Sequence, residues 1–133
     1  QLLYDFGIKM GLAFQLQDDY LDVYGDPAVF GKKIGGDILC NKKTFMLITA
    51  LSLSEGEDKE TLLNWLRATD YVAEEKIQSV TALYNKVGVP ELCQARIDAY
   101  YKEGLELLDK VNVESSLKEE LKKFVCHLMD RKL

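Results

Sequence analysis

Three aspartates lie close together in the segment Asp18-Asp19-Tyr20-Leu21-Asp22, inside a stretch whose apolar residues recur every three or four positions. On a helix, Asp18 and Asp22 lie one turn apart on one face, and Asp19 flanks them. Like charges at this spacing destabilise a helix by about 0.2–0.5 kcal/mol, and carboxylates near a helix C-terminus also oppose the helix dipole. A bound cation would offset both costs. Oxygen ligands without Cys or His favour Mg²⁺ or a similar hard ion.

A basic, glycine-rich segment follows the aspartates at 30–37, and Lys42 and Lys43 come directly before an apolar helical pattern. Lys42 is therefore expected at the N-terminal end of a helix, where free backbone N–H groups and the helix dipole favour an anion. Carboxylates that hold a divalent metal beside such lysines would make a site for a metal-bridged phosphate or diphosphate. The segment is not a P-loop, because the glycine and lysine spacing is absent, and it lacks the alternating oxygen ligands of an EF-hand.

Two glycines precede the aspartates on the same helical stripe. Counting back from Asp18, the stripe contains Gln15, Gly11 and Gly7, and a glycine inside a helix costs about 1 kcal/mol relative to alanine. The glycines therefore indicate either a groove that is kept free of side chains or close packing of two helices. For the aspartates the ordinary alternative is a solvated acidic turn. For the lysines it is an exposed basic loop, which explains the whole set of residues poorly.

Helices must position these groups, because helical spacing dominates the whole chain. A long helix is expected over 1–24, ended by Gly25-Asp26-Pro27, since proline cannot continue a helix. The glycine-rich segment 25–41 shows no helical period and is expected to be a functional loop. Further helices are expected over 43–53, 59–68, 73–87, 91–111 and 116–131. With no strand alternation and no internal repeat, the sequence predicts an all-α fold of about six helices.

Finer features are predicted from individual residues. The second of these helices is apolar nearly all round and is expected to be buried. Gly88 and Pro90 mark a helix end, with the glycine before the proline. Ser115 or Ser116 is expected to cap the last helix, with Glu119 completing a capping box.

Length and composition indicate the class of protein. The chain has 133 residues, of which 47% are hydrophobic and 29% charged, with a net charge of -5; this fits one globular domain or part of one. The acidic balance argues against nucleic acid as a partner, and no apolar run is long enough for a membrane span. The chain begins with Gln1 in the middle of a helical pattern, so we expect it to be a piece of a longer protein.

Cysteine and histidine give little sign of chemistry. Cys40, Cys93 and Cys126 are far apart and odd in number, so no disulfide framework is expected, and a reducing cytoplasm is the predicted location. One histidine and no CxxC pair are too few ligands for a structural zinc site. His127 follows Cys126, but adjacent residues of a helix point about 100° apart, which disfavours a thiol–imidazole pair.

The segment 11–22, Gly-Leu-Ala-Phe-Gln-Leu-Gln-Asp-Asp-Tyr-Leu-Asp, resembles the FQxxDDxxD segment of the trans-isoprenyl diphosphate synthases, the polyprenyl synthetase family. The elements that follow it are similar to the GK…GD…K[ST] segment of that family: Gly31-Lys32-Lys33, Gly36-Asp37, and Lys42 with Thr44. The resemblance implies an all-α helical bundle of the isoprenoid synthase type with a deep central cavity, usually homodimeric. It also implies a Mg²⁺-dependent prenyltransferase that ionises an allylic diphosphate and condenses it with isopentenyl diphosphate, giving farnesyl or geranylgeranyl diphosphate.

The same resemblance implies roles for single residues. Asp18, Asp19 and Asp22 match the metal-binding motif, in which Asp18 matches an aspartate that coordinates Mg²⁺. Gln15 matches a glutamine of the allylic site, and Asp37 matches a carboxylate near the metal. Lys32 and Lys42 match two lysines that contact the allylic diphosphate. The expected catalytic residues are the metal ligand and the two lysines. Arg131 and Lys132 resemble a basic tail that covers the isopentenyl site in some members.

The chain also departs from the family pattern. The first aspartate-rich motif and the arginines that grip isopentenyl diphosphate lie upstream in family members, and nothing in 1–133 replaces them. The chain is therefore predicted to be the C-terminal part of one synthase domain, and we do not expect these residues alone to turn over substrate. A terpene cyclase is less favoured, because its second motif normally mixes Asn or Asp, Ser or Thr, and Glu. A non-catalytic helical regulatory subunit is disfavoured by the intact DDxxD and both lysines.

Overall fold

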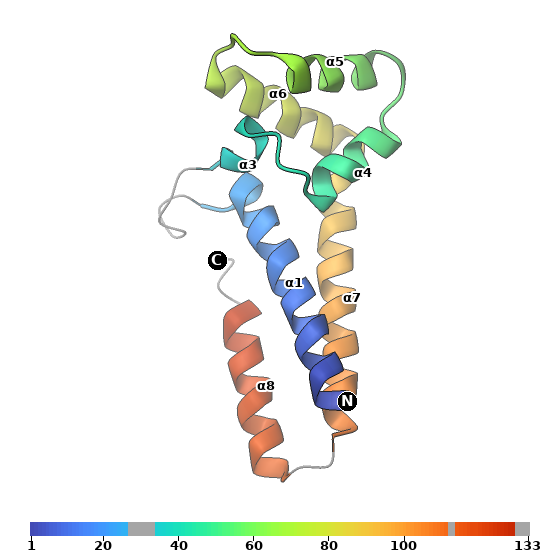
Figure 1. Ribbon diagram of the computed structural model, residues 1–133, viewed down its shortest axis with the longest axis vertical. Helices are drawn as coiled ribbons and strands as arrows, with labels where there is room; N and C mark the ends of the chain where they lie inside the picture. Colours follow the sequence, from blue (N-terminus) through green and yellow to red (C-terminus); the bar gives the residue numbers. More distant parts are fainter. Residues whose placement is uncertain (27–33, 112–113, 130–133) are drawn as a thin grey trace. The chain divides into compact units, whose positions relative to one another are not determined.

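Helices make up the regular structure of the chain. The computed structural model describes residues 1–26, 34–111 and 114–129, and these contain no strand. Their helices are α1 (Leu2–Tyr24), α3 (Gly36–Leu39), α4 (Phe45–Leu53), α5 (Gly56–Arg67), α6 (Ala73–Lys86), α7 (Val89–Asp109) and α8 (Ser115–Met129) (Figure 1). The predicted all-α class is confirmed. None of the described helices is both long enough and apolar enough to cross a membrane.

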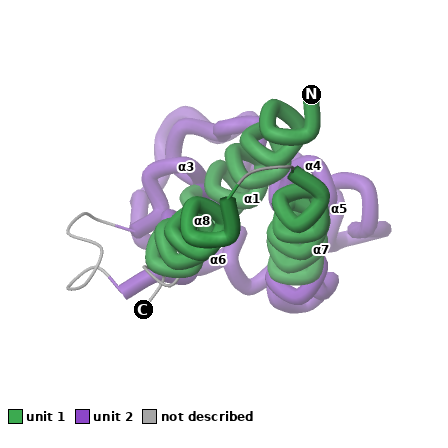
Figure 2. The backbone as a smooth tube through the Cα atoms, turned by 90° about the horizontal axis from the view of Figure 1, so that it is seen from below, with its two compact units in different colours: residues 1–18, 94–133 green, residues 19–93 purple. Residues whose placement is uncertain are grey.

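The chain divides into two compact units (Figure 2). Unit 1 contains residues 1–18 and 94–133, and unit 2 contains residues 19–93. Helices α1 and α7 contribute to both units, because the boundaries fall after Asp18 and after Cys93. Each unit buries apolar side chains of its own, so the candidate site residues on α1 are held by two separate sets of packing contacts.

In unit 1, helices α1, α7 and α8 share an apolar core, whose buried members are Phe6, Leu108, Val111 and Val125. Helix α7 comes close to α1 at Gly104, which is buried, and a Cβ atom at this position would collide with the side chain of Met10. The same two helices are joined at the surface by an ion pair of 2.9 Å between Lys9 and Glu103. The part of α1 that leads to the aspartates is therefore packed against α7.

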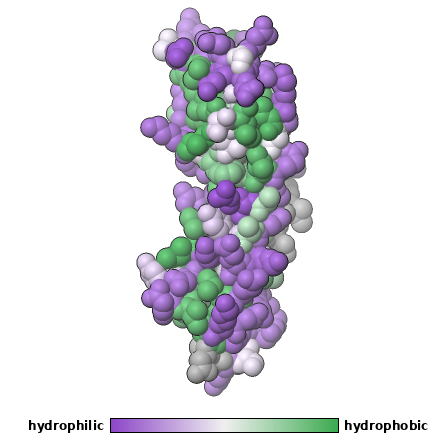
Figure 3. Space-filling model, turned by 90° about the vertical axis from the view of Figure 1, so that its right-hand side faces the viewer, coloured by the Kyte–Doolittle hydropathy of each residue, from purple (hydrophilic) through white to green (hydrophobic). Residues whose placement is uncertain are grey.

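In unit 2, helix α6 is the central element, and α3, α4 and α5 each contact it. The apolar side chains that these helices bury include Met46, Leu47, Ala50, Leu62, Val80 and Leu83. The predicted burial of α4 is right for one face only, since Ile48 and Leu53 are 57% and 46% exposed. Apolar side chains reach the surface in both units (Figure 3); in unit 1 they include Leu3, Tyr4 and Ile8 of α1 and Phe124 of α8.

The expected loop 25–41 contains a one-turn helix, α3. Its hydrogen bonds are made by the backbone: the amides of Leu39 and Cys40 donate to the carbonyls of Gly35 and Gly36, each at 3.1 Å. Four residues are too few to show an apolar period, which is why the sequence pattern did not predict this helix. The segment is therefore partly ordered by helical hydrogen bonds where a loop was expected.

Two helices begin earlier than predicted. Helix α5 begins at Gly56, before the predicted start at 59, and its first turn contains Glu57 and Asp58. Acidic residues stabilise a helix N-terminus but carry no apolar signal. Helix α7 begins at Val89, so Pro90 lies in its first turn, where the missing N–H is not needed. The predicted helix end at Gly88 is confirmed, and this glycine has a left-handed φ of 79°.

The predicted capping box at the last helix is wrong. Helix α8 begins at Ser115, so neither Ser115 nor Ser116 is the residue that precedes the helix. Glu114 occupies that position, and its carbonyl accepts the amides of Leu117 and Lys118 at 3.1 and 3.2 Å. The sequence placed the cap one or two residues too late because either serine has the chemistry of an N-cap.

The first prediction concerns Thr44, the N-cap of α4. Its hydroxyl oxygen accepts a hydrogen bond from the Leu47 amide at 3.1 Å, and the residue is 5% exposed. We expect Thr44→Ala to lower the free energy of unfolding by about 1 kcal/mol, because a buried amide loses its acceptor. Thr44→Ser keeps the hydroxyl and should lose clearly less. Urea unfolding measures both variants; equal losses would show that the methyl group, and not the cap, stabilises the helix.

The second prediction concerns Gly35, which precedes α3 with a φ of 96°. A Cβ atom there would lie 2.6 Å from Cδ1 of Ile77, whereas Gly56, with a φ of 58°, has nothing within 4 Å of the same position. Gly56→Ala should cost about 1–2 kcal/mol through the left-handed backbone alone. Gly35→Ala should cost more, because the collision with Ile77 adds to the strain. Thermal unfolding compares the two, and an equal loss would contradict the predicted collision.

Candidate functional site

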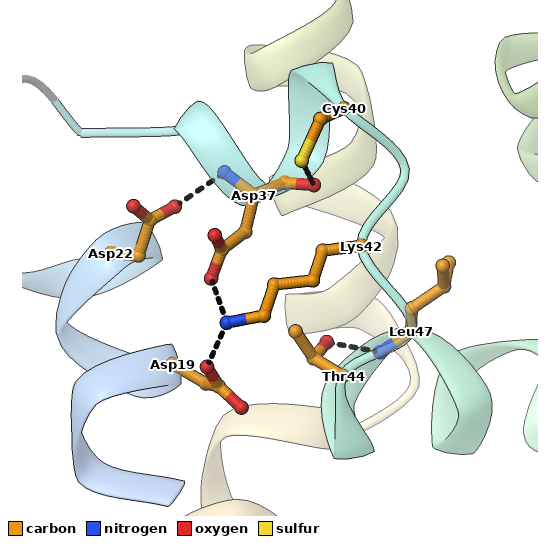
Figure 4. A network of polar contacts seen from close by, with 7 residues as sticks. All are labelled: Asp19, Asp22, Asp37, Cys40, Lys42, Thr44 and Leu47. Carbon is orange, nitrogen blue, oxygen red and sulfur yellow. Dashed lines mark hydrogen bonds and ion pairs between the residues drawn. The ribbon is translucent and has the colours of Figure 1, made fainter. Parts of the chain in front are cut away.

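Lys42 lies between two acidic side chains in unit 2. Its Nζ is 3.0 Å from Oδ1 of Asp19, on the last turns of α1, and 3.9 Å from Oδ2 of Asp37, on α3 (Figure 4). Asp19 is 6% exposed, and the cost of burying its carboxylate is offset by the ion pair and hydrogen bond with Lys42. The hydrogen bond to Asp19 and the charges of both aspartates raise the pKa of Lys42, so the ammonium stays charged at neutral pH.

The side chain of Lys42 is half exposed, and this decides what the pair can do. An ammonium has three donors, and one of them is used by Asp19. The carboxylates hold the side chain in place while part of the ammonium still faces solvent. Lys42 is therefore a positioned cation that can receive a further anion.

Asp22 connects the end of α1 to the start of α3. Its carboxylate accepts the backbone amide of Asp37 at 2.8 Å (Figure 4). Its carbonyl accepts the amide of Gly35 at 2.6 Å. Asp22 is 6% exposed. A carboxylate at a helix N-terminus is favoured by the free N–H groups and by the helix dipole. Asp22 thus fixes α3, which carries Asp37, relative to the acidic end of α1.

The main chain adds a second connection between Asp37 and Lys42. The amide of Lys42 donates to the carbonyl of Asp37 at 2.9 Å, and the thiol of Cys40 contacts the same carbonyl at 3.6 Å. The chain between the two residues therefore closes into a tight turn. Both the backbone and the side chains of this segment are tied to the aspartates of α1.

The structure brings four of the predicted site residues together in unit 2: Asp19, Asp22, Asp37 and Lys42. Asp18 and Gln15 belong to unit 1; Asp18 is half-buried and Gln15 is exposed. Lys32 lies outside the described residues, as do Lys33, Arg131 and Lys132. Of the two lysines predicted for the site, only Lys42 therefore lies within the described residues.

The glycine stripe is open rather than packed. A Cβ atom at Gly7 or Gly11 would meet nothing within 4 Å, and both glycines are exposed, as is Gln15. Close helix packing therefore does not account for them among the residues that the structure describes. The interpretation of a groove kept free of side chains stays a prediction.

The donor set fits a metal that is shared with a phosphate. No three acidic, cysteine or histidine side chains in the described residues are grouped so that they could hold a metal ion, and Asp19 and Asp22 already have protein partners. Mg²⁺ usually takes one or two carboxylates and completes its shell with waters and substrate phosphates. A cavity of about 10 Å³ beside Asp37 and Lys42 has room for little more than one water. This cavity is too small for a diphosphate, and the half-exposed ammonium of Lys42 is the part of the cluster that an anion can reach from solvent.

Sequence reasoning missed two residues next to Lys42. Asn41 has a left-handed φ of 55°, and Lys76 of α6 is 1% exposed, with its ammonium 2.7 Å from Oδ1 of Asn41. A signal for Lys76 was present, since Val80, Leu83 and Tyr84 lie on the same helical stripe and are buried. A charged residue on an apolar stripe is a candidate for a buried polar contact.

The cysteines do not add a nucleophile to the site. Burial raises the pKa of the Cys93 thiol to about 11, with a smaller contribution from Asp19, so the thiol stays protonated at neutral pH. Cys40 and Cys126 are exposed, and all three cysteines are free. The chemistry of the site therefore rests on its carboxylates and on lysine.

Comparisons with known proteins agree with the geometry. The family model "Polyprenyl synthetase" matches residues 1–85. The short chain isoprenyl diphosphate synthase of Methanothermobacter thermautotrophicus is 35% identical over 118 residues, which are 86% of this chain and 35% of that protein.

Two solved structures are similar over nearly the whole chain. A crystal structure of a geranylgeranyl pyrophosphate synthase has a TM-score of 0.86 and 34% identity, over 99% of this chain and 41% of the other. A geranylgeranyl pyrophosphate synthase from Corynebacterium glutamicum, complexed with isoprenyl diphosphate and magnesium, has a TM-score of 0.83 and 30% identity, over 96% and 36%. The chain thus spans about two fifths of these relatives or less. It has the all-α fold of the isoprenoid synthases, and it belongs to the polyprenyl synthetase family.

Proposed function

We propose that the chain is the C-terminal part of a short-chain prenyl diphosphate synthase. The complete enzyme would condense an allylic diphosphate with isopentenyl diphosphate and form farnesyl or geranylgeranyl diphosphate. The observation that carries this proposal is Lys42, a half-exposed cation held at 3.0 Å by Asp19 of the DDxxD segment. The family match and the names of the similar synthases support it.

The site residues divide into groups that would touch the ligand and groups that position them. Asp18 is the proposed direct metal ligand, because it matches the coordinating aspartate of the family motif. Asp19 and Asp22 accept hydrogen bonds from Lys42 and from the Asp37 amide. Asp19 and Asp22 complete the metal motif mainly by fixing its surroundings. Lys42 is proposed to bind the allylic diphosphate together with Lys32, and Gln15 and Asp37 to line that site.

Leaving-group departure is the step that this arrangement serves. Bound Mg²⁺ would neutralise charge that develops on the departing diphosphate, and the magnesium in one similar synthase supports its use here. Lys42 would donate to a diphosphate oxygen whose negative charge grows as the carbon–oxygen bond breaks. Because Asp19 and Asp37 already orient the ammonium, little reorganisation is required at that moment.

Two wider features belong to the same proposal. A homodimer in the cytoplasm is proposed, and the apolar side chains exposed on α1, α4 and α8 support burial in a larger assembly. Three free cysteines are compatible with a reducing compartment. Neither a terpene cyclase nor a regulatory subunit is favoured, because the relatives reported above are named as prenyl diphosphate synthases.

Asp18→Ala tests the metal ligand in the full-length synthase. We expect turnover to fall by at least about 100-fold, because a ligand of the ion that stabilises the leaving group is lost. The free energy of unfolding should change by less than about 1 kcal/mol. Asp5→Ala, at an acidic residue in the first turn of the same helix, is the control and should keep normal turnover. A variant that melts early but keeps its specific activity would show that Asp18 is structural.

Lys42→Ala and Lys43→Ala test the positioned cation against an adjacent, exposed lysine. Loss of one charge-assisted contact should lower kcat/KM for the allylic diphosphate by roughly 10–150-fold in Lys42→Ala. Lys43→Ala should remain within about twofold, as expected for a solvated charge. Lys32→Ala and Lys33→Ala should show the same contrast. Equal losses of kcat/KM in all four variants would contradict specific contacts by Lys32 and Lys42 and would show only a diffuse electrostatic effect of the basic segment.

Calorimetric titration of the chain itself tests the shared metal site. Mg²⁺ alone should bind weakly, because one or two carboxylates do not replace its waters. With inorganic diphosphate present, the affinity for Mg²⁺ should rise at least about tenfold, since phosphate oxygens complete the shell. Tight binding of Mg²⁺ without diphosphate would contradict the proposal and indicate a complete metal site within the chain.

A further inference from the structure

Lys76 of α6 is the most deeply buried charged side chain in the described residues, at 1% exposure. Its ammonium contacts neutral groups: Oδ1 of Asn41 at 2.7 Å, the carbonyl of Leu39 at 3.5 Å, and the ring face of Tyr71 at 4.8 Å from the centroid. Taking an ammonium out of water is costly, and a methionine could fill the same space without that cost. Packing therefore does not explain why a lysine is used here.

Lys76 donates hydrogen bonds to the end of α3 and to the residue directly before Lys42, namely Leu39 and Asn41. Leu39 is the last residue of α3, and its carbonyl is also 3.4 Å from the hydroxyl of Tyr71. The amide group of Asn41 is held from two sides, because its Oδ1 accepts from Lys76 and its Nδ2 donates to the carbonyl of Leu66 at 3.1 Å. Helices α5 and α6 thus fix the side chain of Asn41.

Asn41 sets the direction of the chain directly before Lys42. Its φ of 55° is left-handed, a conformation that asparagine tolerates better than most residues. The turn allows the amide of Lys42 to donate to the carbonyl of Asp37 at 2.9 Å, and the Lys42 side chain then reaches Asp19 at 3.0 Å. A change in this turn would redirect the Lys42 side chain.

We propose that Lys76 is a positioning residue for Lys42, acting through the side chain of Asn41. Lys76 is enclosed and does not meet a ligand itself. Its charge serves to strengthen the hydrogen bond that holds Asn41 in the left-handed turn, since a charged donor bonds more strongly than a neutral one. The consequence for diphosphate binding rests on the function proposed above, whereas the effect on the turn does not.

Amide hydrogen exchange tests the effect on the turn in the chain as it stands. In Lys76→Met, the Lys42 amide should exchange at least about tenfold faster, while the Val87 amide, bonded to Leu83 at the end of α6, should change by less than about threefold. Leu62→Ala is the matched control, because Leu62 is fully buried in α5. It should speed both amides by similar factors. Similar factors in Lys76→Met would overturn the proposal, because Lys76 would then support only the unit as a whole.

Asn41→Gly provides a second route if Lys76→Met does not fold. Glycine adopts the left-handed φ without strain but has no side chain for Lys76 to hold. Faster exchange of the Lys42 amide, with Val87 unchanged, is expected. If the Lys42 amide keeps its wild-type exchange rate, the link through the Asn41 side chain is absent and the proposal is wrong.

A double-mutant cycle tests the effect on the ligand. Calorimetry with MgCl₂ and inorganic diphosphate should show about tenfold weaker binding for Lys76→Met in the wild-type background and no further weakening in Lys42→Ala. Independent effects of the two substitutions would overturn positioning through Lys42. If the wild-type chain binds no magnesium diphosphate, the proposed function of this segment fails, and the exchange experiment still decides the role of Lys76.

Discussion

The ion pair between Asp19 and Lys42 is the interaction on which the candidate site depends. The Asp19 carboxylate, 6% exposed on the last turns of α1, is paired with Lys42. Lys42 can reach it only if the chain between α3 and α4 returns toward α1. The contact of Asp22 with the Asp37 amide and the turn at Asn41 both serve that return. The buried aspartate and the half-exposed lysine thus follow from one constraint. The negative charge of Asp19 is neutralised by an ammonium that itself keeps contact with solvent.

The sequence predicted the elements whose apolar residues recur at helical spacing and the residues that belong to a known motif. The helical class and the long first helix followed from apolar spacing, and Asp19, Asp37 and Lys42 followed from motif spacing. The features that the sequence did not predict depend on contacts between residues that are distant in the chain. Nothing local reveals that Lys76 reaches Asn41 across 35 positions, or that the Asp22 carboxylate accepts the backbone amide of Asp37. Helix α3 was missed because one turn has no period.

Under the proposed function, the lack of a complete metal-binding cluster in the described residues would follow from the chemistry of the ligand. A cage built wholly of protein carboxylates would hold Mg²⁺ with or without substrate, whereas carboxylates that also have internal partners leave coordination positions for phosphate oxygens. The described residues show no self-sufficient cluster, and the chain spans two fifths or less of its similar synthases. Under the proposed function, metal and diphosphate would assemble the site together.

The contact between Gly104 and Met10 has a consequence for sequence change. Because a Cβ atom at 104 would meet the Met10 side chain, the two positions share one fixed volume between α1 and α7. A larger residue at 104 becomes acceptable when position 10 is shortened at the same time, so the pair should drift jointly through evolution. Methionine is suited to this place because its flexible thioether fills irregular gaps. The aspartates lie eight to twelve residues beyond Met10 on the same helix, so the packing at Met10 also restrains the segment of α1 that leads to them.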